Sequence, residues 1–436
     1  MTVLGAATTE ISHWLWAGGA GGLLLLVCLA CLWPRRRNLV TACDVLVVYA
    51  SQTGQAEAIA RRTQAELAAG GVDAHAVSLS AINPTTLVAA KTILVVASTT
   101  GEGDAPDEAR AFEARGFAAR PNLSKQRFAV LALGDRKYDH FCAFGLRLHT
   151  WLDVCGAVAL APCLTADDLD RDTLQQWETQ VSHLGGTAAA AETPPPLWTL
   201  TARERLNPAG SAPLYRLVFT PNEPQAWVAG DLVEVVTRGG HLRDYSIASL
   251  PEEGHLLLYV REVTGADGAP GYGSGLLLHD LAVGDITGLR IKSHKGFHAP
   301  AGNGPVLLIG AGSGLAGLRP HILQLRRREA WVIYGERHPR RDGALVGELE
   351  AMRAQGTLSR LSTAFSQPDD GPSLYVQDAL SAEGARVCDH LIHDGAVMVC
   401  GGLDMGRAVE KILRGLMGDA WIDQALSNGR YRRDLY

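Results

Sequence analysis

The sequence predicts three folded units behind one transmembrane helix: two α/β units with parallel sheets, and an antiparallel β-barrel between them. Three observations support this architecture. Short apolar strand patterns alternate with helix patterns over residues 44–184 and again over 301–436, as in parallel sheets covered by helices. Residues 199–300 carry alternating strand patterns separated by turn residues, which favours an antiparallel barrel. Residues 14–33 form an uncharged apolar run.

Length and composition are those of a folded multidomain chain. It has 436 residues, of which 47% are hydrophobic and 20% charged, so there is room for about three domains. The net charge of −6 disfavours a nucleic-acid partner, which would need a basic surface. The eight cysteines are scattered and indicate reduced thiols. His294/His298 and His390/His393 offer only two ligands per pair, so we predict no metal site.

Residues 14–33 have the length needed to cross a bilayer core and are bounded by Trp14 and Trp33. Pro34 and three arginines, residues 35–37, follow at once. A signal peptide would carry its positive charge before the apolar run and a cleavage site after it. We therefore expect a retained single-pass anchor in the inner (cell) membrane, with the following domains on the cytoplasmic side.

The first α/β unit, residues 44–184, begins with a candidate phosphate-binding loop. A buried-type strand over residues 44–50 runs into hydroxyls and a glycine just before a helix pattern. Backbone N–H groups at a helix N-terminus form a phosphate site that needs no lysine. No Gly-Lys-Ser/Thr follows, which disfavours a nucleoside triphosphate, and a plain hydroxyl-capped helix stays the alternative. The loop consists of Ser51, Gln52, Thr53, Gly54, Gln55 and Ala56.

Two further strands of this unit end in polar or glycine-rich loops. The strands cover residues 92–97 and 128–133, and ligands of parallel sheets bind at the carboxyl ends of the strands. The loop residues are candidates for the same ligand site: Ser98, Thr99, Thr100, Gly101, Gly103, Leu133, Gly134, Asp135, Tyr138, Phe141 and Cys142. These loops also carry carboxylates, among them Asp104, Asp107 and Glu108. They are either an acidic rim that docks a basic partner or ordinary solvent-exposed side chains.

Residues 185–198 form a linker by composition, with glycines and alanines first and three prolines last. In the barrel that follows, residues 199–300, Arg243 and Tyr245 share one face of a predicted strand. The guanidinium there suits a pyrophosphate, although a surface arginine on a barrel strand would look the same. A glycine-rich turn that opens a short helix suits the second half of the pyrophosphate; its residues are Gly271, Gly273 and Ser274.

The last unit, residues 301–436, opens with a strand over residues 306–309 that runs into a glycine-rich turn, Gly310–Leu318. Alone, such a turn is a weak indication of a dinucleotide-binding site. After a barrel with the Arg243 strand and the Gly271–Ser274 turn, it predicts one. Further strands over residues 331–334 and 397–399 end at the same edge of the predicted sheet.

Taken together, these motifs resemble the diflavin reductase family, and within it most closely the flavoprotein subunit of sulfite reductase. The resemblance covers residues 44–436. It implies a flavodoxin-like FMN domain, an FAD-binding barrel of the ferredoxin-reductase type and an NADP-binding domain. The chain is a short form, because few residues separate Val236 from Arg243 where the large members carry a helical insertion.

The resemblance also implies roles for single residues. Ser51 to Ala56 would cradle the FMN phosphate, and Tyr138 would stack on the flavin ring. Thr100 stands where many relatives have an aromatic residue. In the barrel, Arg243, Tyr245 and Ser246 would contact FAD, opposite the Gly271–Ser274 turn. The hydride-transfer site would contain Ser246, Cys400, Asp434 and the terminal Tyr436, which would cover the FAD ring.

For the nicotinamide nucleotide the resemblance implies Gly312, Ser313, Arg337, Ser366, Tyr375 and Gln377. An Arg and a Lys that bind the 2′-phosphate in the family are replaced here by Gln367 and Ser373. Two charge-assisted contacts, each worth on the order of 1.5 to 3 kcal/mol, are therefore missing. We expect NADPH as the donor, with a small advantage over NADH.

The activity implied by the resemblance is electron transfer from NAD(P)H through FAD and FMN to an acceptor. The acceptor would be a redox protein, carrying haem or iron–sulfur or lying in the membrane, or a ferric siderophore. The alternative from a different class is a membrane-tethered flavin-binding sensor or scaffold without turnover. The presence of Ser246, Cys400, Asp434 and Tyr436 favours the enzyme.

Overall fold

The computed structural model describes residues 43–101, 103–187, 194–237, 242–265 and 268–436. The predicted transmembrane segment, residues 14–33, and the arginines behind it lie outside these ranges. Within the described ranges, no helix is both long and apolar enough to cross a membrane.

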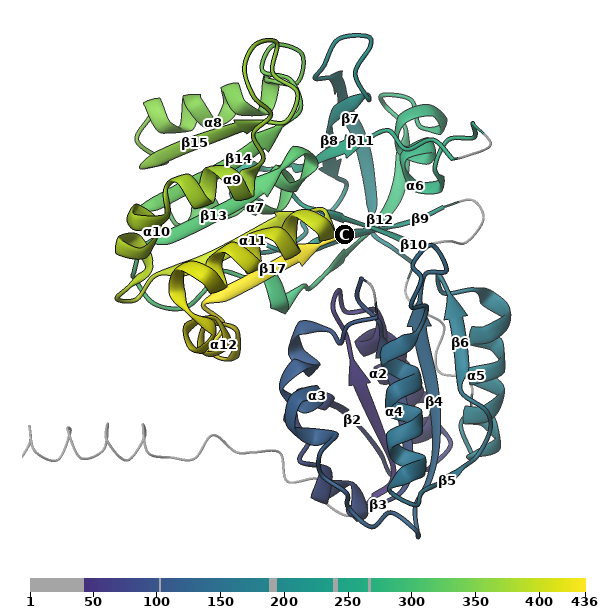
Figure 1. The fold of residues 1–436 in the computed structure, drawn as a ribbon. Coiled ribbons are helices and arrows are strands. Elements are labelled where there is room, and N and C mark those ends of the chain that lie inside the picture. The colour runs from purple at the N-terminus through teal and green to yellow at the C-terminus, as the bar shows by residue number, and fades with distance from the viewer. Residues whose placement is uncertain (1–42, 102, 188–193, 238–241, 266–267) are drawn as a thin grey trace, which may run out of the picture.

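The N-terminal unit is a parallel sheet with helices on both faces (Figure 1). The strands follow the order β2-β1-β3-β4-β5, and β6 pairs with β4. This is a flavodoxin-like order, in which ligands bind where the connections reverse direction. The strands are β1 (Cys43–Ala50), β2 (Ala74–Ser78), β3 (Ala90–Ser98), β4 (Arg127–Gly134), β5 (Val158–Ala159) and β6 (Leu164–Asp167).

Alternate residues of the central strands supply two cores. Leu46 and Val48 of β1 pack with α3 (Arg110–Gly116) and α4 (Ala143–Val154) on one face. Val45 and Val47 pack with α2 (Gln55–Ala69) and α5 (Arg171–His183) on the other. Because both faces are covered, the strands are apolar throughout, which is why they were recognisable in the sequence.

The second unit is an antiparallel sheet in the order β10-β9-β12-β7-β8-β11. Its path closes toward a barrel, because the amide of Ala248, just after β10, donates to the carbonyl of Leu257 in β11 at 2.8 Å. Short helix α6 (Tyr272–Gly275) lies in the predicted glycine turn. The strands are β7 (Leu197–Arg205), β8 (Leu214–Pro221), β9 (Leu232–Val236), β10 (Leu242–Ser246), β11 (Leu256–Arg261) and β12 (Ile286–Lys292).

The third unit is a parallel sheet in the order β15-β14-β13-β16-β17, which matches five strands of the six-stranded dinucleotide-binding order 3-2-1-4-5-6. Its strands are β13 (Val306–Ala311), β14 (Ala330–Glu336), β15 (Arg360–Phe365), β16 (Ala396–Gly401) and β17 (Tyr431–Leu435). Its helices are α7 (Leu315–Gln324), α8 (Ala344–Ala354), α9 (Val376–Ala382), α10 (Gly384–Leu391), α11 (Leu403–Met417) and α12 (Asp419–Ser427).

The barrel and the third unit share one core. Leu257, Tyr259 and Phe297 of the barrel pack with Leu315 and Leu318 of α7. Among the described residues, no core cluster joins residues 43–187 to residues 194–436. The N-terminal unit therefore meets the rest of the molecule without a common apolar core, as a separate lobe (Figure 1).

Candidate functional site

A cavity of about 170 Å³ lies at the carboxyl ends of β3 and β4. Its walls come from the two loops that the sequence singled out, together with the loop after β6. The predicted residues that line it are Gln55, Ser98, Thr99, Gly101, Leu133, Gly134, Asp135, Tyr138, Phe141 and Cys142, and those not predicted are His140, Asp168 and Leu169. Burial raises the pKa of Cys142 to about 12, so its thiol stays protonated.

The predicted phosphate loop lies between β1 and α2. Gly54 has a φ of 86°, which lets the chain turn into the helix. The hydroxyl of Ser51 is buried and has no hydrogen-bond partner among the described residues, and the same holds for Thr100. A phosphate group supplies the acceptors that such orphaned hydroxyls need, so the loop fits a phosphorylated flavin. The roles of the single loop residues stay predictions.

Not all predicted FMN residues line the first cavity. Ser51, Gln52 and Gly54 border a second cavity of about 450 Å³, between the flavodoxin-like lobe and the rest of the molecule. The Ser51 amide donates to Glu108 at 2.7 Å. Ala56 is buried in the lobe's core, while Thr53, Thr100 and Gly103 line neither cavity.

On the barrel, the sequence-predicted pyrophosphate residues meet as expected. A Cβ on Gly273 would lie 2.5 Å from the Tyr245 hydroxyl and 3.0 Å from Cγ of Arg243, so only glycine allows this approach. The Ser274 hydroxyl accepts the Val263 amide at 3.2 Å. Gly271 lies directly before α6, next to Ser274. The cradle has the small residues and the cation that a pyrophosphate needs.

Arg243 also makes a contact that the sequence did not reveal. Its two terminal nitrogens donate to the two carboxylate oxygens of Asp168, at 2.9 and 2.7 Å. Asp168 belongs to the flavodoxin-like lobe and lines its cavity. This bidentate pair engages both terminal nitrogens of the guanidinium and ties the barrel to the neighbouring lobe.

The predicted hydride-transfer residues come together around one carboxylate. The Ser246 hydroxyl donates to Oδ2 of Asp434 at 2.9 Å, and the Cys400 thiol donates to the same oxygen at 3.6 Å. Cys400 and Asp434 are direct neighbours in the β16–β17 register. Burial, and next the charge of Asp434, raise the pKa of Cys400 well above its usual range, so the thiol remains a donor.

Two further contacts shape this cluster. The hydroxyls of Tyr436 and Ser313 lie 3.0 Å apart, which joins the chain terminus to the glycine-rich turn after β13. A Cβ on Gly317 would lie only 2.8 Å from Sγ of Cys400. Gly317 is thus the residue that lets α7 approach the thiol, which accounts for the glycine at this position of the turn.

A third cavity, of about 560 Å³, opens beside Tyr436. All residues predicted for the nicotinamide nucleotide line it: Gly312, Ser313, Arg337, Ser366, Tyr375, Gln377 and Tyr436. Their individual roles stay predictions.

Three charged residues of this cavity were not predicted: Arg261, Glu336 and Asp404. Glu336, at the end of β14, has a side chain only 2% exposed, and burial raises its pKa to about 7. Its carboxylate lies 2.9 Å from the Tyr334 hydroxyl and 4.0 Å from Arg261. An acid at the end of the second strand is a known signal in dinucleotide-type sheets and would have identified Glu336. Arg261 comes from the barrel and carries no such signal.

Comparison with known proteins supports the flavodoxin-like fold of the N-terminal lobe. The flavodoxin family matches residues 47–179. These residues form a flavodoxin-like domain. Over most of its length the chain is similar to proteins called "Sulfite reductase [NADPH] flavoprotein alpha-component". The one from Thiocapsa roseopersicina is 28% identical over 85% of this chain and 83% of its own length. Those from Bacillus subtilis and Yersinia enterocolitica are 23% and 24% identical, over 90% and 91% of this chain and 89% and 90% of theirs.

Proposed function

We propose that the protein is an NADPH-dependent flavoprotein oxidoreductase of the diflavin reductase type. It uses FMN, FAD and NADPH and passes electrons from NADPH through FAD and FMN to a redox acceptor. The observation that carries the proposal is the cluster of Ser246, Cys400 and Asp434 beside Tyr436, at the junction of the barrel with the dinucleotide-type unit. The similarity to the sulfite reductase flavoproteins, over 85% and 90% of the chain, supports it.

FAD, when bound, supplies the chemistry that separates a hydride into single electrons. Arg243, Tyr245 and the α6 turn would hold it, and the 560 Å³ cavity would hold the nucleotide. Asp434 accepts hydrogen bonds from Ser246 and Cys400 through one oxygen, so it fixes the orientation of both donors. The half-buried Ser246 hydroxyl is thereby held beside the buried Cys400 and Asp434, where it would act as the hydrogen-bonding group next to the flavin.

FMN would bind at the 170 Å³ cavity, which Gln55 of the predicted phosphate loop lines, whereas Ser51, Gln52 and Gly54 of that loop border the neighbouring 450 Å³ cavity. Ser51, whose hydroxyl has no partner among the described residues, would meet the phosphate from the side of that second cavity. Cys142 lines the cavity as a protonated thiol, because burial raises its pKa to about 12, so it offers no thiolate there.

For the nucleotide we propose a small preference for NADPH over NADH. Gln367 and Ser373 replace the two cations expected at the 2′-phosphate, and Glu336 adds an acid to the cavity. Arg337, which follows the last residue of β14 and lines the cavity, would still offer a positive charge to the 2′-phosphate.

We also propose that residues 14–33 anchor the protein in the inner (cell) membrane, with the flavin domains in the cytoplasm. The length of the apolar run and the arginines at 35–37 support this. The acceptor would be a redox protein with haem or iron–sulfur, or in the membrane, or a ferric siderophore.

The test is flavin analysis and turnover of the purified full-length chain in detergent. We expect one FAD and one FMN per chain and reduction of ferricyanide by NADPH. Asp434→Asn should slow FAD reduction by about 10²-fold with FAD retained, because the charged acceptor of two donors is lost. Asp389→Asn, at an exposed position on α10, is the matched control. Flavins without NADPH-driven reduction would favour the sensor or scaffold, and a flavin-free protein would overturn both proposals.

A further inference from the structure

The flavodoxin-like lobe is attached to the remainder of the molecule mainly by charges. Arg243 of the barrel binds Asp168, and Lys295 lies 4.0 Å from Glu57. Helix α11 contributes Arg407, 3.8 Å from Asp104. No apolar core cluster of the described residues crosses this boundary. Polar interfaces of this kind allow lobes to separate and dock again.

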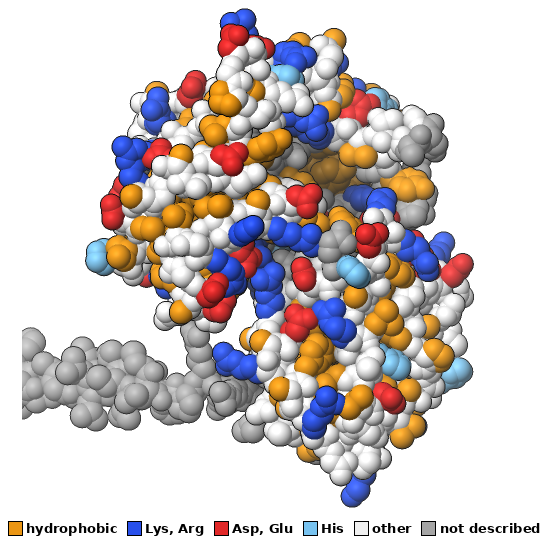
Figure 2. All heavy atoms as spheres, in the orientation of Figure 1, with side chains coloured by type: hydrophobic (Ala, Val, Ile, Leu, Met, Phe, Trp, Pro, Cys, Tyr) orange, Lys and Arg blue, Asp and Glu red, His pale blue; other side chains and the backbone are white. Residues whose placement is uncertain are grey.

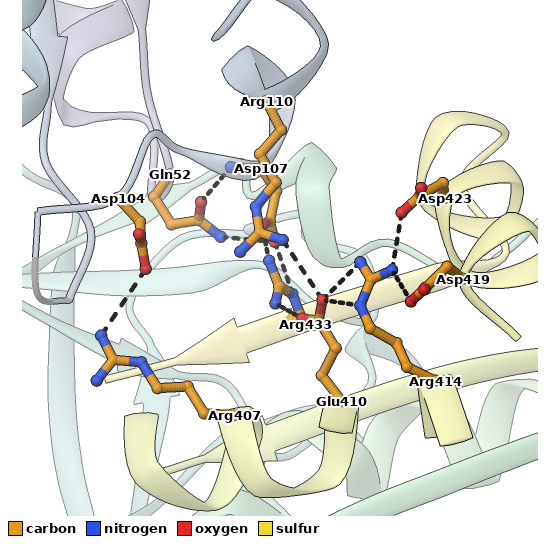
Figure 3. A network of polar contacts seen from close by, with 10 residues as sticks. All are labelled: Gln52, Asp104, Asp107, Arg110, Arg407, Glu410, Arg414, Asp419, Asp423 and Arg433. Carbon is orange, nitrogen blue, oxygen red and sulfur yellow. Dashed lines mark hydrogen bonds and ion pairs between the residues drawn. The ribbon is translucent and has the colours of Figure 1, made fainter. Parts of the chain in front are cut away.

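At the centre of the interface is a ring of four charges, which we call the Arg433 ring: Asp107, Arg110, Glu410 and Arg433 (Figure 3). Arg433 donates through Nε to Oδ2 of Asp107 at 3.2 Å and through Nη2 to its Oδ1. Another nitrogen of Arg433 binds Glu410. Arg110 closes the ring, 3.2 Å from Asp107 and 3.7 Å from Glu410. Asp107 and Arg110 belong to the lobe, and the other two to the dinucleotide-type unit.

Residues of both units make further contacts with members of the Arg433 ring. Arg414 binds Glu410 at 2.9 Å and is itself held by Asp419 and Asp423, at 3.1 and 3.0 Å. On the lobe, Gln52 of the phosphate loop accepts the amide of Asp107 at 2.9 Å. Asp107 is therefore joined to the predicted FMN loop as well as to Arg433 (Figure 3).

The ring is also joined to the hydride-transfer cluster through β17. This edge strand pairs only with β16 among the described strands, and Arg433 directly precedes Asp434 on it. Beyond them, the Tyr436 amide donates to Gly401 at 3.2 Å. The Arg433 side chain is only 6% exposed, and its charge lies between the flavodoxin-like lobe and the dinucleotide-type unit. Loss of one carboxylate partner leaves that charge partly uncompensated, which is strongly unfavourable.

We propose that docking of the flavodoxin-like lobe positions the end of β17 through the Arg433 ring, so that the hydride-transfer cluster is aligned only in the docked arrangement. Asp107 and Arg433 are positioning residues, since they act through Asp434 and Tyr436. The inference rests on the proposed function for its catalytic consequence only. By linkage, binding of the nucleotide beside Tyr436 strengthens docking to the same extent that docking strengthens nucleotide binding.

The test compares Asp107→Asn and Asp107→Arg with the wild type by amide hydrogen exchange, on the full-length protein in detergent without NADPH. We expect exchange at the amides of residues 433–436 to rise by on the order of tenfold in Asp107→Asn and more in Asp107→Arg, because β17 opens locally. Asp107→Glu keeps the charge and should restore slow exchange. The control is Asp153→Asn, at an exposed position on α4.

A second readout is the single-turnover rate of FAD reduction by NADPH, which should fall by about tenfold in Asp107→Asn with flavin content unchanged. Wild-type exchange at residues 433–436 in both Asp107→Asn and Asp107→Arg would overturn the inference. Such a result would leave the proposed function intact, because that function is judged by flavin content and turnover. If the wild type lacked flavin or NADPH-driven reduction, the proposed function would be wrong. The hydrogen-exchange result would still decide whether docking orders the end of β17.

Discussion

At the scale of single residues, the chemistry of this protein depends on buried carboxyl groups. Asp434 is 5% exposed and orients two donors, one from the barrel and one from the neighbouring strand. Glu336 lies in the nucleotide cavity and, because burial raises its pKa to about 7, it is neutral at lower pH than that value and charged above it. We therefore expect the two acids to have different effects: Asp434 on the Ser246 and Cys400 donors, and Glu336 on the affinity for a nucleotide in the cavity.

The charge of Glu336 gives a pH-dependent prediction. Below about pH 7 it holds a proton, and above that pH its negative charge repels a 2′-phosphate dianion. Wild type and Glu336→Gln should bind 2′,5′-ADP equally at pH 6, whereas at pH 8 the variant should bind several-fold more tightly. Calorimetric titration at both pH values measures this. With 5′-ADP, which lacks the 2′-phosphate, the difference should shrink, and an affinity ratio independent of pH would contradict the prediction.

At the scale of elements, β17 contributes to two sites. Its alternation sends Arg433 toward the lobe interface and Asp434 toward Ser246 and Cys400. The strand ends in Tyr436, which bridges to Ser313 and lines the nucleotide cavity. Because β17 is an edge strand that pairs with β16 on one side, it connects the lobe interface at Arg433 with the cavity that Tyr436 lines.

Truncation of the chain after Leu435 tests the role of this end. Because the Tyr436 ring occupies a wall of the cavity that a nicotinamide must share, its removal should lower KM for NADPH and NADH, by on the order of tenfold, and reduce the preference between them. In the intact chain that preference should already be far below a thousandfold. Tyr436→Phe keeps the ring and should behave like wild type. Steady-state kinetics with NADPH and with NADH measure these changes. If the KM values of the truncated chain equal those of the wild type, Tyr436 is only part of a surface tail.

At the scale of the whole molecule, two kinds of interface differ. The barrel and the dinucleotide-type unit share an apolar core, whereas the flavodoxin-like lobe is held by ion pairs. Figure 2 shows Lys, Arg, Asp and Glu side chains gathered along the boundary between the lobe and the rest. We therefore expect the flavodoxin-like lobe to be the part of the molecule that separates when charges are screened.

High salt should therefore weaken the attachment of the flavodoxin-like lobe to the rest of the molecule. The Debye length falls from about 10 Å at 0.1 M to about 3 Å at 1 M, which screens the partly exposed pairs Arg407–Asp104 and Lys295–Glu57. Small-angle scattering should show a radius of gyration that increases between 0.05 and 1 M NaCl, by on the order of 10%. Sucrose at equal osmolarity is the control, because it leaves charges unscreened. A constant radius across the series would mean that apolar contacts hold the lobe.

Much of the fold was predictable because its signals are local. The strands over residues 92–97, 128–133 and 306–309 were recognised from apolar runs and lie within β3, β4 and β13. Each ends in a loop of the kind that the sequence singled out. Residues such as Tyr138 and Ser366 were placed at the correct sheet edge, since parallel strands align their carboxyl ends. The membrane segment at residues 14–33 remains a prediction from sequence alone.

The three sheets, the glycine turns and the chemical types of the residues at the strand ends could be predicted from the sequence, because they depend on neighbours along the chain. The meeting of distant groups could be seen only once the chain was folded. Ser246 and Asp434 are 188 residues apart, and Asp107 and Arg433 are 326 apart. Contacts at such separations depend on how the lobes pack, which no local periodicity encodes. The raised pKa of Glu336 has the same origin, since desolvation arises from burial by the whole fold.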